Sequence, residues 1–113
     1  MFIKKRNQRI SHKNSSICVA YEYPFDDKSI NISLVKINGR YPETGQVTNT
    51  KVKEIIFVKS GKGKIVINKK AIKLEKEDVI LLLPNEKYYF EGKFEFITSC
   101  SPAWFEGQHK FVK

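Results

Sequence analysis

The side chain with the clearest chemical potential is Glu54, a single carboxylate at the start of the apolar stretch Glu54-Ile-Ile-Phe-Val58. Alternate side chains of a strand share a face, so Glu54, Ile56 and Val58 are expected on one side. If that side is buried, the charged carboxylate is disfavoured unless hydroxyls, amides or a lysine bind it. Such a group can act as a general base or hold the hydroxyls of a sugar-like ligand. The alternative is a structural glutamate in an internal hydrogen-bond network, or one that points to solvent.

Two other segments offer binding residues. The polar loop Gly39-Arg-Tyr-Pro-Glu-Thr-Gly45 contains Arg40, which can bind an anionic group, and Tyr41, which can stack on a ring. The alternative is a surface connection whose proline and glycines only set a turn. In the C-terminal segment, Trp104 and Phe105 are either pocket walls or packing residues.

Motifs for several other chemistries are absent from the sequence. No glycine-rich phosphate loop precedes a helix, since we interpret Ser60-Gly-Lys-Gly63 as a hairpin turn. There is no GxSxG nucleophile elbow and no Cys-x-x-Cys pair. Cys18 and Cys100 each lie in an apolar run, and we expect two buried free thiols rather than a disulfide.

The elements that must position these residues are strands. Short runs rich in Ile, Val, Phe and Tyr alternate with turn signals, and no stretch of ten residues has a helical apolar stripe. The sequence therefore predicts a single all-β domain that forms a sandwich or barrel. The expected strands are Ile17–Tyr23, Ile30–Ile37, Lys53–Val58, Lys64–Asn68, Ala71–Leu74, Asp78–Leu83, Lys87–Phe90 and Phe94–Cys100. Turns are expected at Pro24–Asp27, Asn38-Gly39, Ser60–Gly63, Asn68–Lys70, Pro84-Asn85 and Glu91-Gly92.

The net charge of +9 is concentrated at one end of the chain. Lys4, Lys5, Arg6, Arg9 and Lys13 lie in residues 1–13, which contain no acidic residue. We predict a basic N-terminal arm over residues 1–14, either mobile or docked as a strand on a partner chain, and a barrel domain over residues 15–113. The remaining lysines are dispersed along strands, so no stripe for nucleic acid is expected. No apolar run is long enough to span a membrane, and no secretory signal is evident, so we expect a cytoplasmic protein.

The arrangement around Glu54 resembles the cupin family. Cupins have a first motif with two histidines, a glutamate and, after six more residues, a glycine, which Glu54 and Gly61 match. Their second motif has a Gly-Asp turn, a strand, a proline loop and a third histidine. Here Glu77-Asp78, Val79–Leu82, Pro84 and Tyr88 stand in those places. The similarity extends from about Gly39 to Cys100, and it implies a cupin-type double-stranded β-helix, or jelly-roll barrel, of the small bacterial kind.

The departures from this pattern define the predicted site. The places of the two histidines hold Thr48 and Thr50 in one register, and Val47 and Asn49 in the other. Only Glu54 remains of the four metal ligands of the family, and transition metals need three or four such donors. These departures from the family pattern therefore predict a site without metal or other cofactor. Its residues would be Glu54 and Tyr88 for catalysis, with Arg40, Tyr41, Thr48, Asn49 and Thr50 for ligand binding.

Three functions remain open at this point. The first is a metal-independent cupin that binds, or isomerises by proton transfer, a carbohydrate-like or carbonyl compound. The second is a non-enzymatic sensing or interaction module. The third is a divalent-metal enzyme with an unusual ligand set that includes His109, because His12 and His109 could reach the site by folding back. Strands such as Asp78-Val-Ile-Leu-Leu-Leu83 are apolar on both faces, which also predicts a homodimer or a covering C-terminal segment.

Overall fold

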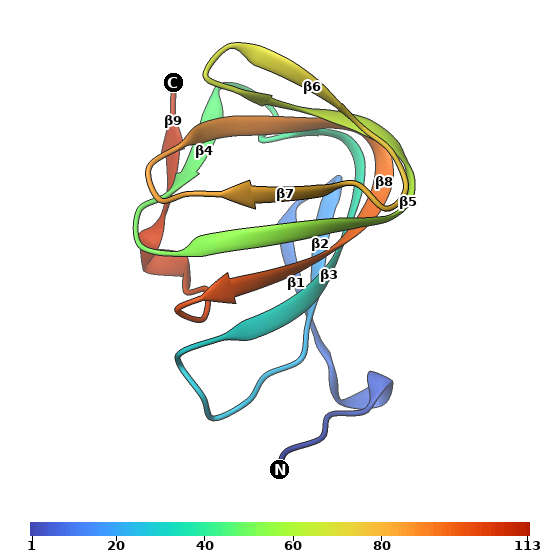
Figure 1. The fold of residues 1–113 in the computed structure, drawn as a ribbon, viewed down its shortest axis with the longest axis vertical. Coiled ribbons are helices and arrows are strands. Elements are labelled where there is room, and N and C mark those ends of the chain that lie inside the picture. The colour runs from blue at the N-terminus through green and yellow to red at the C-terminus, as the bar shows by residue number, and fades with distance from the viewer.

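The computed structural model describes all 113 residues, and its secondary structure is almost entirely antiparallel strands (Figure 1). The predicted all-β class is therefore confirmed. Two short 3-10 helices, η1 (Arg6–Gln8) and η2 (Glu106–Gln108), complete the structure. The strands are β1 (Ile10–Ser15), β2 (Cys18–Glu22), β3 (Asn31–Tyr41), β4 (Gln46–Asn49), β5 (Lys53–Ile67), β6 (Lys70–Leu74), β7 (Val79–Leu82), β8 (Lys87–Ser101) and β9 (His109–Val112).

All the strands belong to one sheet that curls into a half-barrel. The order along its main path is β1-β2-β3-β8-β4-β9, while β5 pairs with β8 and also with β6 and β7. The two longest strands, β5 and β8, cross the molecule, bend at the right edge of Figure 1 and return in the other layer. They pair with each other from Lys53↔Ser101 to Ile67↔Tyr88. This pairing holds the two layers of the curled sheet together.

Three predicted turns are in fact bends inside continuous strands. Gly39, Gly92 and Gly63 are paired in one row across β3, β8 and β5. Gly92 has φ +141°, and a Cβ atom there would lie 2.5 Å from the Cα atom of Gly63. Only glycine allows this backbone conformation and this close approach between strands. The expectation of separate strands before and after the glycines at 61–63 and 92 was therefore wrong, because the glycines bend the chain there without reversing it.

The other turn predictions agree with the structure. Asn68 and Lys69, with φ values of 51° and 67°, connect β5 to β6. Asn85 has φ 71° in the connection between β7 and β8, the left-handed conformation that asparagine tolerates best after glycine. Strands β1, β4 and β9 were not predicted, because they are short and lack alternation of apolar residues.

The predicted boundary at residue 14 falls inside β1. Residues 10–15 pair with β2 of the same chain, so this part of the basic arm is a strand of the domain's own sheet. The division into an arm and a barrel domain stays a prediction. No helix in the structure is both long enough and apolar enough to cross a membrane.

The core lies between the layers of the curled sheet. Its largest members are aromatic: Phe90, Phe94 and Phe96 form a cluster with ring centroids 5.1–6.0 Å apart, and Tyr88 packs on Phe90 at 5.3 Å. Ile56 and Val58 of β5 are completely buried in the same core. The two cysteines are buried and free, as expected.

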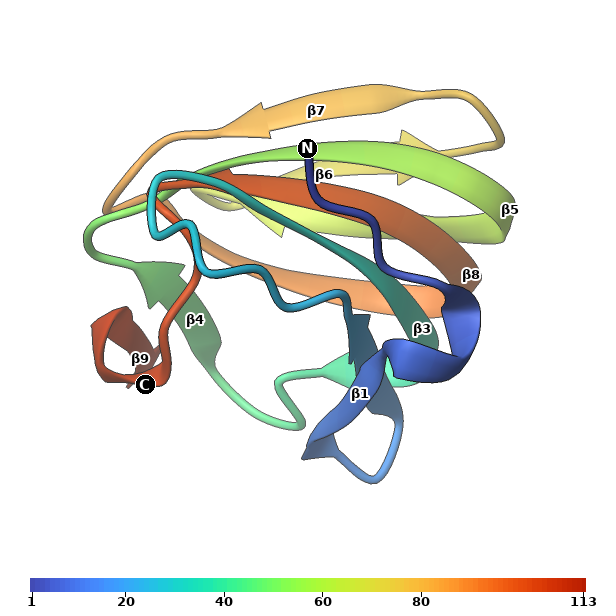
Figure 2. The same ribbon diagram turned by 90° about the horizontal axis from the view of Figure 1, so that it is seen from below.

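One outer face of the sheet is apolar and exposed. On β5 and β7, the cross-strand pairs Ile55↔Leu81 and Phe57↔Val79 have side chains between 42% and 57% exposed. The C-terminal segment does not cover them, because β9 pairs with β4 on another part of the sheet (Figure 2).

Candidate functional site

A cavity of about 70 Å³ lies inside the curl of the sheet. Its wall combines side chains from β1, β2, β3, β5, β8, β9 and the segment before β9. The wall combines apolar side chains, among them Val35, Ile37, Phe90 and Phe96, with polar ones. A water molecule needs about 10–15 Å³ of such space, so the cavity has room for a small organic molecule.

Two carboxylates, Glu22 and Glu54, line this cavity, and Glu54 is the more deeply buried of the two. Strand alternation buries it together with Ile56 and Val58, as predicted, and it is 8% exposed. Thr98 Oγ1 donates to its Oε2 atom at 2.6 Å, and Asn49 Nδ2 donates to its Oε1 atom at 3.0 Å. Burial raises the pKa of Glu54, while these two hydrogen bonds oppose the shift. Neither salt bridge of the structure includes Glu54, so no cation compensates its charge.

Asn49 connects Glu54 to the rest of the polar wall. Its Nδ2 atom is also 3.4 Å from the hydroxyl of Tyr88. Its Oδ1 atom is bound by three nitrogen atoms, Trp104 Nε1 at 3.3 Å, Gln108 Nε2 at 2.9 Å and His109 Nδ1 at 2.8 Å. We call these six residues the Asn49 network: Asn49, Glu54, Tyr88, Trp104, Gln108 and His109. Asn49 is 3% exposed and lies behind the cavity wall, where it fixes the side chains that form the wall.

His109 and Tyr41 form a second polar pair on the wall. The distance between His109 Nε2 and the Tyr41 hydroxyl is 2.9 Å, and the two rings are parallel within 7°. Burial, together with the nearby His12, lowers the pKa of His109 to about 4, so its imidazole is neutral at pH 7. Burial raises the pKa of the Tyr41 phenol above its usual value.

Three rings form a row at the polar part of the cavity. Trp104 lies between His12 and His109, with ring centroids 5.8 Å and 5.5 Å away. The planes of neighbouring rings are tilted by 58° and 56°, so the row offers both ring faces and ring edges to a ligand. Of the two alternatives for Trp104, the structure therefore favours a pocket wall, whereas Phe105 is 49% exposed and does not line the cavity.

The structure brings together four of the seven predicted site residues. Glu54, Tyr88 and Tyr41 line the cavity. Asn49 does not line it but hydrogen-bonds to Glu54 and Tyr88. The functions assigned to them stay predictions. Thr48 is buried but does not line the cavity, and its hydroxyl has no partner. Thr50 donates to the backbone oxygen of Gln108 at 2.8 Å and so attaches the C-terminal segment.

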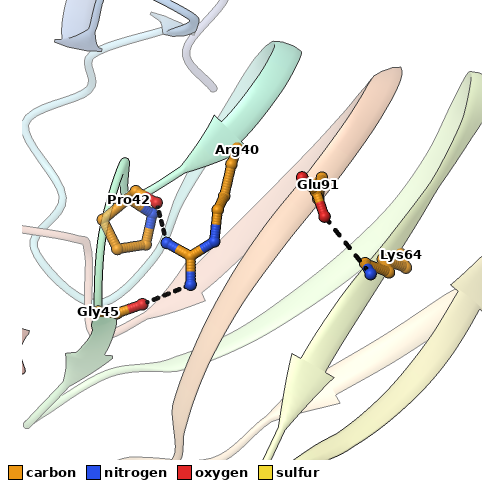
Figure 3. Close-up of polar contacts among 5 residues, drawn as sticks. All are labelled: Arg40, Pro42, Gly45, Lys64 and Glu91. Carbon is orange, nitrogen blue, oxygen red and sulfur yellow. Dashed lines mark hydrogen bonds and ion pairs between the residues drawn. The ribbon is translucent and has the colours of Figure 1, made fainter.

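Arg40 lies away from the cavity. Its guanidinium group donates to the backbone oxygens of Pro42 and Gly45 at 2.6 and 3.0 Å (Figure 3). It also lies over the ring of Tyr89, at 3.8 Å from the centroid. With these partners Arg40 fixes the loop between β3 and β4, and its role in ligand binding stays a prediction.

Several wall residues were missed by the sequence analysis. Thr98 binds Glu54 because β8 pairs with β5, and the alternation of buried Phe94, Phe96, Thr98 and Cys100 was the available signal. His12 and His109 were named only as able to fold back, and the structure places both on the wall. His109 arrives there because β9 pairs with β4 in the register Asn49↔His109. No sequence pattern pointed to that pairing.

The donors around Glu54 do not fit the metal site of the metal-dependent cupins. No group of three His, Cys, Asp or Glu side chains lies close enough together to hold an ion. Both ring nitrogens of His109 already hydrogen-bond with Tyr41 and Asn49. The direct partners of Glu54 are an amide and a hydroxyl, which are weak ligands for transition metals.

No family model and no curated protein matches the sequence. Solved structures match its fold closely. Pac13 from Streptomyces, described as a nucleoside dehydratase, superposes with a TM-score of 0.88 at 19% identity over 100% of this chain and 92% of Pac13. Other structures of Pac13 contain uridine and carry a Tyr-to-Phe or His-to-Gln substitution. Ectoine synthase from P. lautus has a TM-score of 0.75 at 12% identity, over 100% of this chain and 91% of the synthase.

A further match is KdgF from Halomonas sp., with a TM-score of 0.67 at 12% identity over 87% of this chain and 90% of KdgF. At these identities the matches establish the architecture. The chain has the cupin fold, as the resemblance in its sequence implied, and it is similar to enzymes that act on small molecules.

Proposed function

We propose that this cupin-fold chain binds a small polyhydroxylated molecule, such as a sugar or nucleoside, in the cavity and transfers a proton next to a carbonyl group of that molecule. The observation that carries the proposal is Glu54, a buried carboxylate that faces an open cavity without a cation beside it. Maintaining such a group costs stability, and groups of this kind concentrate at functional sites.

The polar wall supports a ligand rich in hydroxyl groups. Glu54 accepts hydrogen bonds, and the side-chain oxygen of Asn31 is a buried acceptor without a partner. Buried acceptors without partners are rare in proteins, and a ligand hydroxyl would satisfy this one. The row of His12, Trp104 and His109 adds a surface for a ring, and Pac13, whose fold matches, has been solved with uridine.

The proposed reaction needs only a base and a hydrogen-bond donor. The carboxylate of Glu54 takes the proton from the carbon beside the carbonyl, and the two electrons of the broken C–H bond form the C=C bond of an enolate. The Tyr88 hydroxyl stabilises the negative charge on the enolate oxygen. If the α carbon carries a hydroxyl, that hydroxyl passes its proton to the enolate oxygen, and return of the first proton from Glu54 to the former carbonyl carbon gives the isomeric hydroxy-carbonyl compound. If the β carbon carries a hydroxyl, the C–O bond breaks, the departing oxygen takes the proton from Glu54 and water is released.

The test replaces Glu54 by Gln and compares it with Glu75→Gln, which changes an exposed glutamate outside the cavity. Uridine and D-ribulose serve as probes in calorimetric titrations, and D-ribulose also serves in an NMR assay of deuterium exchange from solvent. We expect Glu54→Gln to weaken binding by about tenfold or more, the value of one charged hydrogen bond, and to stop exchange. Glu75→Gln should match the wild type. Equal affinity and exchange in Glu54→Gln would refute the proposal.

We also propose that the chain pairs as a homodimer through the exposed face of β5 and β7. Ile55, Phe57, Val79 and Leu81 form a contiguous apolar surface on paired strands, which favours a protein contact. A two-fold dimer is the simplest symmetric assembly that buries such a face. Light scattering should give about twice the chain mass of 13.2 kDa, and Leu81→Lys should give the single-chain mass. A wild-type monomer at high concentration would contradict this.

A further inference from the structure

The hydrogen positions of the Asn49 network can be deduced from groups that can only donate. The backbone N–H groups of Lys51 and Val52 point to Gln108 Oε1, at 3.2 and 3.4 Å. Because backbone N–H groups donate, that atom of Gln108 must be its oxygen, and the other end of the amide must be the NH₂ group. The NH₂ group of Gln108 then donates to Asn49 at 2.9 Å. The contacted atom of Asn49 is therefore its oxygen.

A second donor leads independently to the same orientation. The indole N–H of Trp104 cannot accept a hydrogen bond, and it lies 3.3 Å from the same atom of Asn49. Two separate donors thus fix the Asn49 amide, with its oxygen toward the C-terminal segment and its NH₂ group toward Glu54 and Tyr88.

This orientation determines the tautomer of His109 and the direction of the Tyr41 hydroxyl. His109 Nδ1 lies 2.8 Å from the Asn49 oxygen and must carry the proton. In the neutral ring Nε2 is then an acceptor, so the Tyr41 hydroxyl donates to it across 2.9 Å. The hydroxyl proton of Tyr41 is thereby committed to His109. Tyr41 presents only the lone pairs of its oxygen to the cavity.

The same amide has the opposite effect on Tyr88. The NH₂ group of Asn49 donates to the Tyr88 oxygen at 3.4 Å, and that hydroxyl makes no other hydrogen bond in the structure. The proton of Tyr88 is therefore free to point into the cavity. Glu54, bound by Asn49 and Thr98, presents the remaining lone pairs of its carboxylate.

We infer that Asn49 is a positioning residue that gives the two tyrosines opposite hydrogen-bonding polarity, so the cavity selects a hydroxy-carbonyl compound whose carbonyl oxygen binds Tyr88 and whose hydroxyl binds Tyr41. This inference rests on the proposed function for the identity of the site. It adds the arrangement of donors and acceptors that the ligand must have.

The titratable groups that face His109 are His12 from β1, Tyr41 from β3, Glu54 from β5 through Asn49, and Tyr88 from β8. Protonation of His109 would remove the acceptor at Nε2 and turn the Tyr41 hydroxyl toward the cavity. The selection should therefore hold at pH 7 and be lost in acid.

The first test is made on the wild-type protein without ligand. The chain has only two histidines, so ¹⁵N-histidine labelling gives two sets of signals, and His12→Gln assigns them. Long-range ¹H–¹⁵N spectra at pH 7 distinguish the two neutral tautomers. We expect the Nδ1–H form for His109. The Nε2–H form, or a charged ring, would overturn the inference, and neither result depends on what the protein binds.

The second test measures the polarity with hydroxyacetone and with methoxyacetone, whose oxygen cannot donate. Affinities come from NMR titration. Tyr41→Phe should lower the affinity for hydroxyacetone about tenfold and leave the affinity for methoxyacetone unchanged, because only a ligand that donates a hydrogen bond interacts with the Tyr41 oxygen. An equal loss for both probes would show that Tyr41 donates to the ligand, and would overturn the inference.

A double-variant cycle assigns the effect to Asn49. Asn49→Asp keeps the acceptor for His109 but offers an oxygen instead of an NH₂ group to Glu54 and to Tyr88. The two carboxyl groups then share a proton, and the Tyr88 proton turns away from the cavity. Asn49→Asp and Tyr88→Phe should each lower the affinity for hydroxyacetone about tenfold, and the double variant should lower it by no more than either single variant. Additive losses would refute the role of Asn49. If Asn49→Asp does not fold, the tautomer measurement still decides.

The two proposals fail in different ways. If Glu54→Gln binds like the wild type but His109 has the Nδ1–H tautomer, the proposed function is wrong and the network is as described. If Glu54→Gln loses binding but Tyr41→Phe lowers the affinity for hydroxyacetone and methoxyacetone equally, the proposed function stands. The donor and acceptor roles inferred for Tyr88 and Tyr41 are then wrong.

Discussion

Acid should destabilise this protein through His109, and the size of the effect follows from its burial. An exposed histidine has a pKa of 6.5, and burial lowers that of His109 to about 4. In the unfolded chain His109 therefore binds a proton below pH 6.5, whereas in the folded chain it binds one only below about pH 4. The stabilisation from neutral His109 is fully present above pH 6.5 and is lost as the pH falls to about 4. Between pH 7 and pH 5 the loss is about 2 kcal/mol.

Urea unfolding at pH 7 and pH 5 measures this loss when the wild type is compared with His109→Gln. The variant lacks the titrating group, so the free energy of unfolding should fall by about 2 kcal/mol less than in the wild type over this interval. His12→Gln is the control and should keep most of the wild-type dependence, because burial is the larger cause of the shift at His109. The same pH dependence in the wild type and in His109→Gln would refute the reasoning.

Three further predictions concern the carboxylate and the fold. Burial raises the pKa of Glu54 above 4.5, so the folded protein binds a proton more readily than the unfolded chain. In urea titrations the free energy of unfolding of the wild type should therefore rise relative to that of Glu54→Gln as the pH falls from the raised pKa toward 4.5. A difference between the two proteins that does not change with pH would contradict the burial of Glu54. Gly92→Ala places a Cβ 2.5 Å from Gly63 and should cost at least about 2 kcal/mol, while Gly107→Ala, with 3.9 Å of clearance, should be nearly neutral by the same assay. Phe96→Ala should lower the free energy of unfolding by about 3–5 kcal/mol, and the exposed Phe105→Ala by less than about 0.5 kcal/mol.

The sequence predicted those features that depend on neighbours along the chain. Alternation around Glu54 correctly placed Ile56 and Val58 on the buried face, and the turn at Asn85 followed from the tolerance of asparagine for positive φ. The glycines at 61, 63 and 92 were misinterpreted because a glycine permits a turn and a bend equally well. What distinguishes the two is the partner strand, since Gly92 is opposite Gly63.

The site residues divide in the same way. Glu54 and Tyr88 could be proposed from strand pattern and resemblance, and Tyr41 from the composition of its loop. All three line the cavity. Gln108, Trp104 and His109 owe their position to the pairing of β9 with β4, which joins residues about sixty positions apart. Arg40 had the composition of a ligand-binding residue, but its nearest acceptors are the carbonyls of its own loop.

The row of Gly39, Gly92 and Gly63 has a consequence for how the protein opens. The row is a crease that β3, β8 and β5 cross without interruption, and backbone pairing continues on both sides of it. Neither half of the sheet can therefore detach while the other stays intact. Amide hydrogens on both sides of the crease, for instance those of Ile56 and Ile65, should exchange only in global unfolding and with similar protection. The short strands β1, β6 and β9, each paired along one edge only, should exchange faster by independent fraying.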